Sequence, residues 1–170
     1  MNQSAPPHTT PHPAACSGSF TQLLSATRRG ARLARLLGVG QLRSWEMPQD
    51  LVERAEVVVA ELAANAVLHA HVPGRCFRLT LVHEPAAGLL RVEVSDARGD
   101  LHPRLPAGPA DADALRSGGR GLALVAALAD HWDCVPFPPV GKTVRAVLST
   151  RGDAIAISPR ASGAVRMSDS

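Results

Sequence analysis

The chain is poor in aromatic residues. Phe, Trp and Tyr together make up 3% of its 170 residues, and Tyr is absent. Nucleic-acid-binding domains stack bases on aromatic side chains or gather basic residues into a patch. The formal net charge is only +3, so the composition argues against direct nucleic-acid binding. The core must be built from Leu, Val and Ala, because hydrophobic residues still form 45% of the chain.

Cysteines and long hydrophobic runs are scarce as well. Cys16, Cys76 and Cys134 form neither a CxxC pair nor an even set, which favours reduced thiols over a disulfide or zinc framework. No segment reaches the roughly 18 uninterrupted apolar residues that a membrane-spanning helix needs. Residues 1–19 contain several prolines and no apolar run, so we expect no signal peptide. These absences predict a cytoplasmic protein without a membrane-spanning segment.

The remaining pattern predicts one domain with a tail at each end. Residues 1–19 and 151–170 lack hydrophobic periodicity and are expected to be disordered. Residues 20–150 read as β-α-α-β-β, a long loop, and then α-β-β. That order predicts an α+β fold: a two-layer sandwich in which a mixed, mainly antiparallel sheet carries helices on one face.

Hydrophobic periodicity and turn residues place the individual elements. Strands are expected at residues 20–25, 77–82, 90–95, 133–137 and 142–149. A first helix should run from the N-cap Thr27 to Leu37 and end at Gly38 or Gly40. Its apolar stripe is formed by three leucines, Leu33, Leu36 and Leu37. Two further helices are expected at residues 48–69 and 120–129.

Two polar clusters stand out within these elements. Glu61 and Asn65 are four residues apart in the second predicted helix, which stacks their side chains on one face. Further along, Gly118, Gly119 and Gly121 open a helical pattern, where backbone N–H groups can receive phosphate oxygens. Together the clusters indicate a magnesium–nucleotide site. Either one alone would be read as a solvated helix face or a turn.

The chain resembles the GHKL (histidine-kinase-like) ATPase family. The resemblance rests on an ordered set of motifs: Glu61-xxx-Asn65, Asp96 at a strand end, Gly119-Arg120-Gly121-Leu122, and Gly141-Lys142-Thr143. Within this family, the chain looks most like the short bacterial anti-sigma-factor serine/threonine kinases, in particular the stand-alone actinobacterial branch. The segments that carry this likeness are ELAANAVLHA, VEVSD, GGRGLALVAALADHW and GKTVRAVL. The resemblance implies the Bergerat-type ATP-binding fold.

The resemblance also implies roles for four side chains toward ATP and Mg²⁺. Asn65 would hold the metal through its amide oxygen, and Glu61 would act as general base. Asp96 would accept the adenine amino proton. Thr143 would complete that edge by a direct or water-mediated contact.

The phosphates would be held at the start of the third helix. The residues implied there are Gly118, Gly119, Arg120, Gly121 and Leu122. Their backbone N–H groups and the helix dipole favour an anion, and the arginine would add positive charge. The long loop at residues 97–117 would form the ATP lid.

The activity implied by the resemblance is that of an ATP-dependent protein serine/threonine kinase. It would hold a sigma factor and phosphorylate a serine of an antagonist protein, and homodimerisation is possible by family analogy. The alternative is a nucleotide-gated protein-binding module with little or no kinase activity. The same pocket would serve both functions, so the sequence leaves them open.

Three features depart from the wider family or invite a different interpretation. Asp96 is followed by Ala-Arg-Gly, whereas many relatives have glycine where this chain has Arg98. Gly141-Lys142-Thr143 is not a Walker A motif, because a strand follows it instead of a helix. Lys142 is therefore expected on the surface of a hairpin. His69 is expected to be a structural residue at a helix end.

Overall fold

The protein folds into one layer of sheet and one layer of helices. The computed structural model describes residues 17–69, 74–103 and 119–150. The strands are β1 (Gly18–Ser25), β2 (Cys76–Glu84), β3 (Leu89–Asp96), β4 (His131–Phe137) and β5 (Gly141–Ser149). The helices are α1 (Arg28–Ser44), α2 (Gln49–Leu68) and α4 (Gly119–Leu128). The predicted α+β class and element order are confirmed, although β1 includes residues 18 and 19, the last two of the predicted tail.

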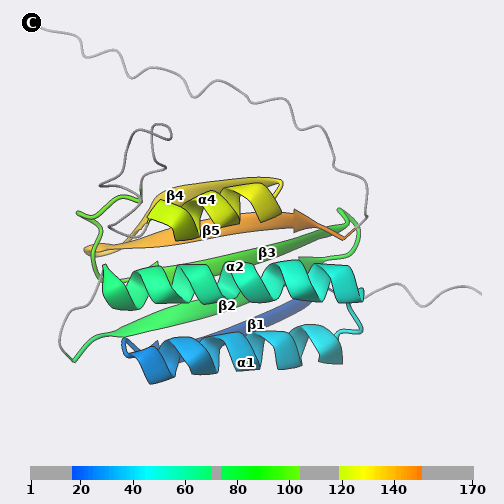
Figure 1. Cartoon of the computed structure of the whole chain (residues 1–170), viewed down its shortest axis with the longest axis horizontal. Helices are drawn as coiled ribbons and strands as arrows, with labels where there is room; N and C mark the ends of the chain where they lie inside the picture. Colours follow the sequence, from blue (N-terminus) through cyan, green and yellow to red (C-terminus); the bar gives the residue numbers. More distant parts are fainter. Residues whose placement is uncertain (1–16, 70–73, 104–118, 151–170) are drawn as a thin grey trace, which may run out of the picture.

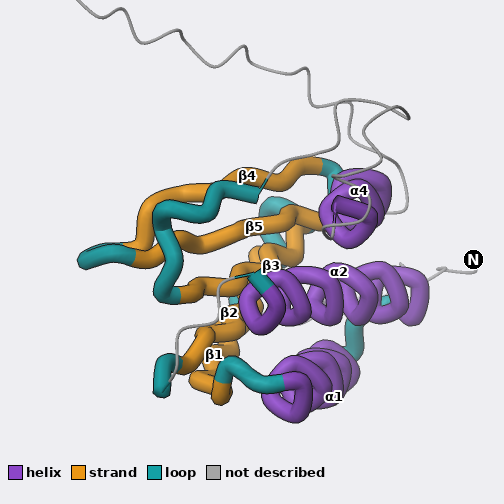
Figure 2. Tube along the Cα trace, turned by 60° about the vertical axis from the view of Figure 1, so that its left-hand side comes forward, coloured by secondary structure: helices purple, strands orange, loops and turns teal. Residues whose placement is uncertain are grey.

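The sheet has the strand order β1-β2-β3-β5-β4. Every neighbouring pair is antiparallel, so the described sheet is not mixed. All three helices lie against one face and leave the other face open (Figure 1; Figure 2). The register between β3 and β5 sets Asp96 directly opposite Lys142, and Ser95 opposite Thr143.

The core lies between the sheet and α2. Every second residue of β2 and β3 is fully buried, as alternation along a strand requires, and these residues include Leu79, Leu81 and Val92. The predicted apolar stripe of α2 is confirmed: Leu51, Ala55, Val58 and Leu62 are all buried. Each buried leucine contributes about 1.5–3 kcal/mol. This packing fixes α2, and with it Glu61 and Asn65, against the sheet.

The first helix differs from its prediction in length and in orientation. Thr27 is its N-cap, accepting the Gly30 N–H at 3.0 Å, but the helix continues to Ser44. The buried positions are Gly30, Ala34, Gly38 and Leu42, whereas the predicted Leu33 and Leu36 are 44% and 51% exposed. A Cβ on Gly38 would lie 3.6 Å from Val59, so this face is closely packed on α2. Packing of small residues outweighs the helix-breaking tendency of glycine here.

The chain segments that carry the predicted site meet at one end of the sandwich. Nη2 of Arg54 donates to the carbonyl of Ser149 at 2.9 Å, which ties the first half of α2 to the last residue of β5. The N–H of Asp130 donates to the carbonyl of Val147 at 2.9 Å, so α4 also finishes at that far end. The end of α2, the end of β3 and the starts of α4 and β5 therefore share the opposite end, on the left in Figure 1. None of the helices in the described ranges is long and apolar enough to cross a membrane.

Candidate functional site

Glu61 and Asn65 meet the first turn of α4. A Cβ built on Gly121 would lie 2.3 Å from Oε2 of Glu61 and 3.8 Å from Oδ1 of Asn65. The shorter distance is well inside van der Waals contact, so only glycine fits beside Glu61 as it stands. The structure thus brings together three predicted site residues from α2 and α4, two helices that pack on each other.

The side-chain amide of Asn65 is buried and incompletely bonded. Its Nδ2 has no hydrogen-bond partner among the described residues. A buried polar group without a partner costs about 1–3 kcal/mol, a cost that is typical of functional sites rather than of a packed core. The amide oxygen is a ligand type suited to Mg²⁺.

The donor set around Asn65 fits a metal held jointly with a nucleotide. Within residues 17–69, 74–103 and 119–150, no group of three His, Cys, Asp or Glu side chains is placed to hold a metal ion. Magnesium commonly takes one or two protein ligands and completes its octahedron with phosphate oxygens and water. Asn65 beside the glycine-lined turn of α4 fits that arrangement.

The start of α4 offers an exposed cation and a helix N-terminus. Arg120 is exposed and the first turn has no acidic residue, so the helix dipole there favours an anion. Leu122 is buried at 6% exposure within the core, where it anchors the helix. Gly118 and residues 104–117 of the predicted lid lie outside the described residues. The phosphate contacts expected of this turn stay predictions.

A second polar cluster lies where β3 ends and β5 begins. Oδ1 of Asp96 accepts the backbone N–H of Arg98 at 2.8 Å and Nζ of Lys142 at 2.9 Å. Nζ of Lys142 also donates to the carbonyl of Arg98 at 2.8 Å. The residues Asp96 and Lys142 are only 7% and 6% exposed, so this is a buried ion pair with supporting hydrogen bonds.

The prediction that Lys142 lies on a hairpin surface is wrong. Alternation along β5 sets Lys142 in phase with the core residues Val144 and Ala146, and the register sets it opposite Asp96. The sequence carried two signals for this position. One was the strand period, and the other is that Lys142 is the only lysine among 18 basic residues.

Two glycines let the backbone close around Asp96. A Cβ on Gly141 would lie 2.2 Å from the carbonyl oxygen of Asp96. A Cβ on Gly99 would lie 2.7 Å from the carbonyl oxygens of Val140 and Gly141. The turn after Asp96 therefore requires its glycine at position 99, and Arg98 occupies the preceding position without steric conflict. Sequence reasoning had not given either glycine a role.

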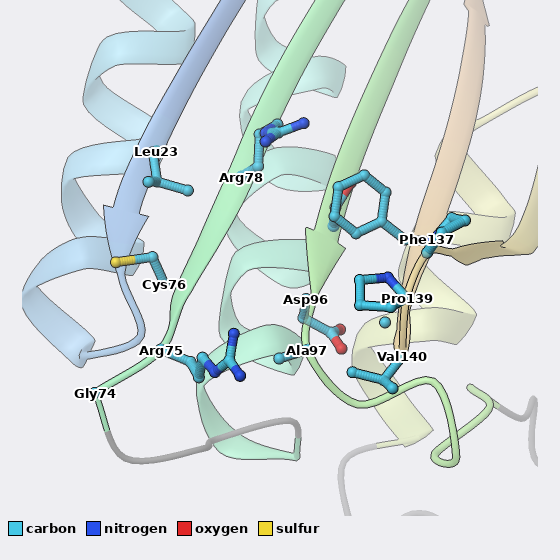
Figure 3. A pocket seen from close by; sticks show the side chains of 13 residues that line it. Leu23, Gly74, Arg75, Cys76, Arg78, Asp96, Ala97, Phe137, Pro139 and Val140 are labelled. Atoms are coloured by element: carbon cyan, nitrogen blue, oxygen red, sulfur yellow. The ribbon is translucent and has the colours of Figure 1, made fainter.

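Thr143 lies on the other face of the sheet. Its hydroxyl is 2.8 Å from that of Ser95, and both are buried. This face also carries a cavity of about 310 Å³ that shares Asp96 with the site and is lined by Leu23, Arg78, Phe137 and others. Figure 3 shows these side chains on the face away from the helices. The described contacts give Thr143 no bond to the Asp96 carboxylate, and its role toward a nucleotide stays a prediction.

The approach to Asp96 is charged. Arg98 hydrogen-bonds Asp100 through two nitrogens at 2.8 and 2.7 Å, and this contact lowers the pKa of Asp100 to about 2. Asp100 is therefore ionised at neutral pH and neutralises the guanidinium of Arg98. Lys142 remains the cation in direct contact with Asp96.

Two smaller predictions concern a histidine and the thiols. His69 is the C-cap of α2, its N–H donating to the carbonyl of Asn65 at 3.0 Å, and the residue is exposed. Its placement at a helix end is confirmed. Within the described chain, Cys76 and Cys134 are free thiols, as predicted, and Cys16 lies outside it.

Comparison with protein families defines the class. Residues 24–148 match the family model described as histidine kinase-like ATPase domain, so the chain belongs to the histidine kinase-like ATPase family. This confirms the family indicated by the sequence motifs. No curated protein matches the chain.

Among solved structures, thirteen chains match. One is the crystal structure of the RsbU and RsbW domains of Rv1364c from Mycobacterium tuberculosis, with a TM-score of 0.58 and 17% sequence identity. The match covers 78% of this chain and 32% of the mycobacterial chain. At this identity the likeness shows a shared fold, and it confirms the predicted two-layer architecture.

Proposed function

We propose that this chain is an ATP-binding regulator of the anti-sigma-factor type, a kinase that transfers the γ-phosphate of ATP to a serine of an antagonist protein. The observation that carries the proposal is the contact of Glu61 and Asn65 with Gly121. It sets a candidate base and a candidate metal ligand beside the helix end expected to hold phosphates. Membership of the histidine kinase-like ATPase family supports ATP as the nucleotide.

Asn65 and the first turn of α4 would hold the metal and the phosphates. Mg²⁺ held there would supply positive charge that offsets the negative charge of the phosphates. Asn65 would contribute its Oδ1, and the backbone N–H groups that open α4 would receive the phosphate oxygens. Arg120, in the same turn, would add a charge-assisted hydrogen bond.

Glu61 would act on the attacking hydroxyl. Its carboxylate lies one helical turn before Asn65 and reaches Gly121. In the transfer, the bond between the γ-phosphorus and the ADP oxygen breaks, and a bond to the serine oxygen forms. The hydroxyl proton passes to the Glu61 carboxylate, which needs to be within hydrogen-bond reach of the serine.

Asp96 would recognise the base at the strand end. Its Oδ1 is engaged by Arg98 and Lys142, and its Oδ2 has no partner among the described residues. A free carboxylate oxygen is an acceptor for the amino group of adenine. The turn closed by Gly99 and Gly141 keeps the carboxylate in place.

The proposed partners are a sigma factor and its antagonist protein. Support comes from the resemblance of the sequence motifs to anti-sigma-factor kinases and from the fold shared with the RsbU–RsbW protein. A homodimer is compatible with the same proposal. The exposed Leu33 and Leu36 of α1, flanked by arginines, offer one surface for such contacts.

The test is phosphoryl transfer from radiolabelled ATP. We expect the wild-type protein, with Mg²⁺, to label an antagonist protein drawn from a panel of the host's candidates. Glu61→Ala should bind ATP without transferring label, and Asn65→Ala should transfer no label and lose about 100-fold in affinity for Mg-ATP. Glu53→Ala is the matched control, because Glu53 is an exposed carboxylate on the same helix.

Two results would change the proposal. Transfer by Glu61→Ala at the wild-type rate would remove Glu61 as the base. ATP binding by the wild type without label on any protein of the panel would favour the nucleotide-gated binding module instead.

A further inference from the structure

Lys142 is a buried cation, and one of its donors is unused within the part of the chain that the structure describes. Its ammonium group carries three N–H donors, and two of them go to Asp96 Oδ1 and the carbonyl of Arg98. The third has no partner among the described residues. Burying an ammonium group is costly unless its donors are satisfied. The unused donor therefore favours an acceptor from a ligand or from water.

The choice of lysine at this position is specific. Lys142 is the only lysine in a chain whose other basic residues are all arginine. Arginine serves the surface pairs of this protein, for example Arg145 with Asp133 and Arg91 with Glu84. A compact ammonium group, which fits where a planar guanidinium does not, appears only beside Asp96.

Lys142 and Asp96 present a donor next to an acceptor. They are direct partners in the β3–β5 register, and both are in phase with the core residues on the α2 side of the sheet. Within the described chain, Oδ2 of Asp96 accepts no hydrogen bond, and one N–H of the Lys142 ammonium group donates none. The edge of adenine presents the reverse order, because its amino group donates and the adjacent ring nitrogen N1 accepts.

We propose that Lys142 reads the base directly, donating from Nζ to N1 of adenine while Asp96 Oδ2 accepts from the amino group. This inference rests on the proposed ATP-binding function and adds a specificity residue to it. Lys142 also holds the Asp96 carboxylate through Oδ1, so the two residues act as one recognition unit. Thr143, the next residue, lies on the other face of the sheet, where its hydroxyl is bonded to that of Ser95.

A binding cycle with a modified nucleotide separates base reading from simple charge neutralisation. ATP and 1-deaza-ATP, in which N1 is replaced by C–H, are titrated into wild type and Lys142→Met. A hydrogen bond from a charged donor predicts that the wild type loses about 10- to 100-fold in affinity when N1 is absent. Lys142→Met should bind the two nucleotides within about 2-fold of each other, since the donor has already been removed.

Two controls fix the interpretation. Arg145→Met removes a cation from the same strand on the side that faces away from Lys142, and it should keep the wild-type ratio between the affinities for the two nucleotides. Purine riboside triphosphate, which lacks the amino group, should bind less tightly than ATP to both wild type and Lys142→Met, because Asp96 is present in each. The proposal would be overturned if Lys142→Met showed the same ratio of affinities for ATP and 1-deaza-ATP as the wild type.

A measurement on the wild-type protein covers the case in which Lys142→Met fails to fold. Labelling with ¹⁵N-lysine gives a single side-chain signal, because the sequence holds one lysine. We expect that Nζ signal to shift on adding ATP and to shift much less with 1-deaza-ATP. Equal shifts would overturn the inference, whereas failure to bind ATP at all would overturn the proposed function.

Discussion

The strand end and the helix end of the site differ in how far the protein satisfies its own polar groups. At the strand end, Asp96 and Lys142 are buried, ion-paired and tied to the backbone of Arg98. At the helix end, the amide nitrogen of Asn65 has no partner among the residues that the structure describes, and Glu61 lies against Gly121. In the proposed site, the half assigned to the base would therefore be built before a ligand arrives, whereas the half assigned to the phosphates would be completed by the ligand.

This difference separates folding from binding along the same site. Polar groups that satisfy one another contribute to the stability of the fold, and removing one of them leaves the other buried without a partner. Polar groups without partners reduce stability and are retained for function. Substitutions at the strand end should therefore mainly lower the stability of the fold, whereas substitutions at the helix end should mainly lower the affinity for the nucleotide.

The largest effect is expected for Asp96→Ala. It leaves the Lys142 ammonium buried without its counter-ion, and removing one partner of a buried pair costs about 3–5 kcal/mol. Urea denaturation followed by circular dichroism measures this loss. Asp133→Ala is the control, because its pair with Arg145 is about one-third exposed and should cost no more than about 1 kcal/mol. Equal losses of unfolding free energy in the two variants would show that the buried Asp96–Lys142 pair stabilises the fold no more than an exposed pair does.

The next effect is expected for Asn65→Ala, at the opposite end. Affinity for Mg-ATP should fall by about 100-fold, as for loss of a metal-site residue. The free energy of unfolding without nucleotide should stay constant or rise by about 1 kcal/mol, because a buried unpartnered amide is removed. Calorimetric titration and urea denaturation measure the two quantities. A stability loss above about 2 kcal/mol would assign Asn65 to the fold instead.

Gly121→Ala should separate transfer from binding. The new Cβ would occupy the position of Glu61 Oε2, and the flexible carboxylate end can rotate away at a cost of about 1 kcal/mol. Phosphoryl transfer should fall as far as in Glu61→Ala while ATP binding remains. Gly40→Ala is the matched helical control, since no atom lies within 4 Å of its Cβ; it should add about 0.5–1 kcal/mol of stability. Unchanged transfer by Gly121→Ala would show that Glu61 does not need its observed position.

The smallest expected effect is the loss of folding stability at acid pH. Hydrogen bonding to Arg145 lowers the pKa of Asp133, and Arg98 lowers the pKa of Asp100 to about 2. A carboxylate with a depressed folded-state pKa stabilises the fold above its unfolded value, near 3.8, and loses that contribution as the pH falls toward the folded value. We expect a shallow decline in unfolding free energy from about pH 4 to pH 2. Asp133→Asn should make this decline with pH slightly shallower. An unchanged decline would show that the Asp133–Arg145 pair does not contribute to it.

Local patterns in the sequence predicted most of the fold. The stripe of α2 and the alternation of β2 and β3 are periodic, so their buried faces follow from the residues alone. The Glu61–Asn65 pair follows equally from helical spacing. The contact of this pair with Gly121 depends on how α2 packs on α4, and only the resemblance of the motifs predicted it.

The errors arose where tertiary packing outweighed local preference. In α1, glycine was taken as a terminator, yet Gly38 lies at a close approach to α2. Leu33 and Leu36 were assigned to the core, although the face of α1 that packs on the domain is formed by Gly30, Ala34, Gly38 and Leu42. At Lys142, a charged residue was assigned to the surface because its partner lies 46 residues away in sequence.

Isothermal titration of the wild-type protein with ATP, with and without Mg²⁺, tests whether the two ends form one nucleotide site. We expect saturable 1:1 binding that is tighter with Mg²⁺, together with loss of the magnesium effect in Asn65→Ala. No binding heat under either condition, or equal affinities with and without the metal, would contradict the account.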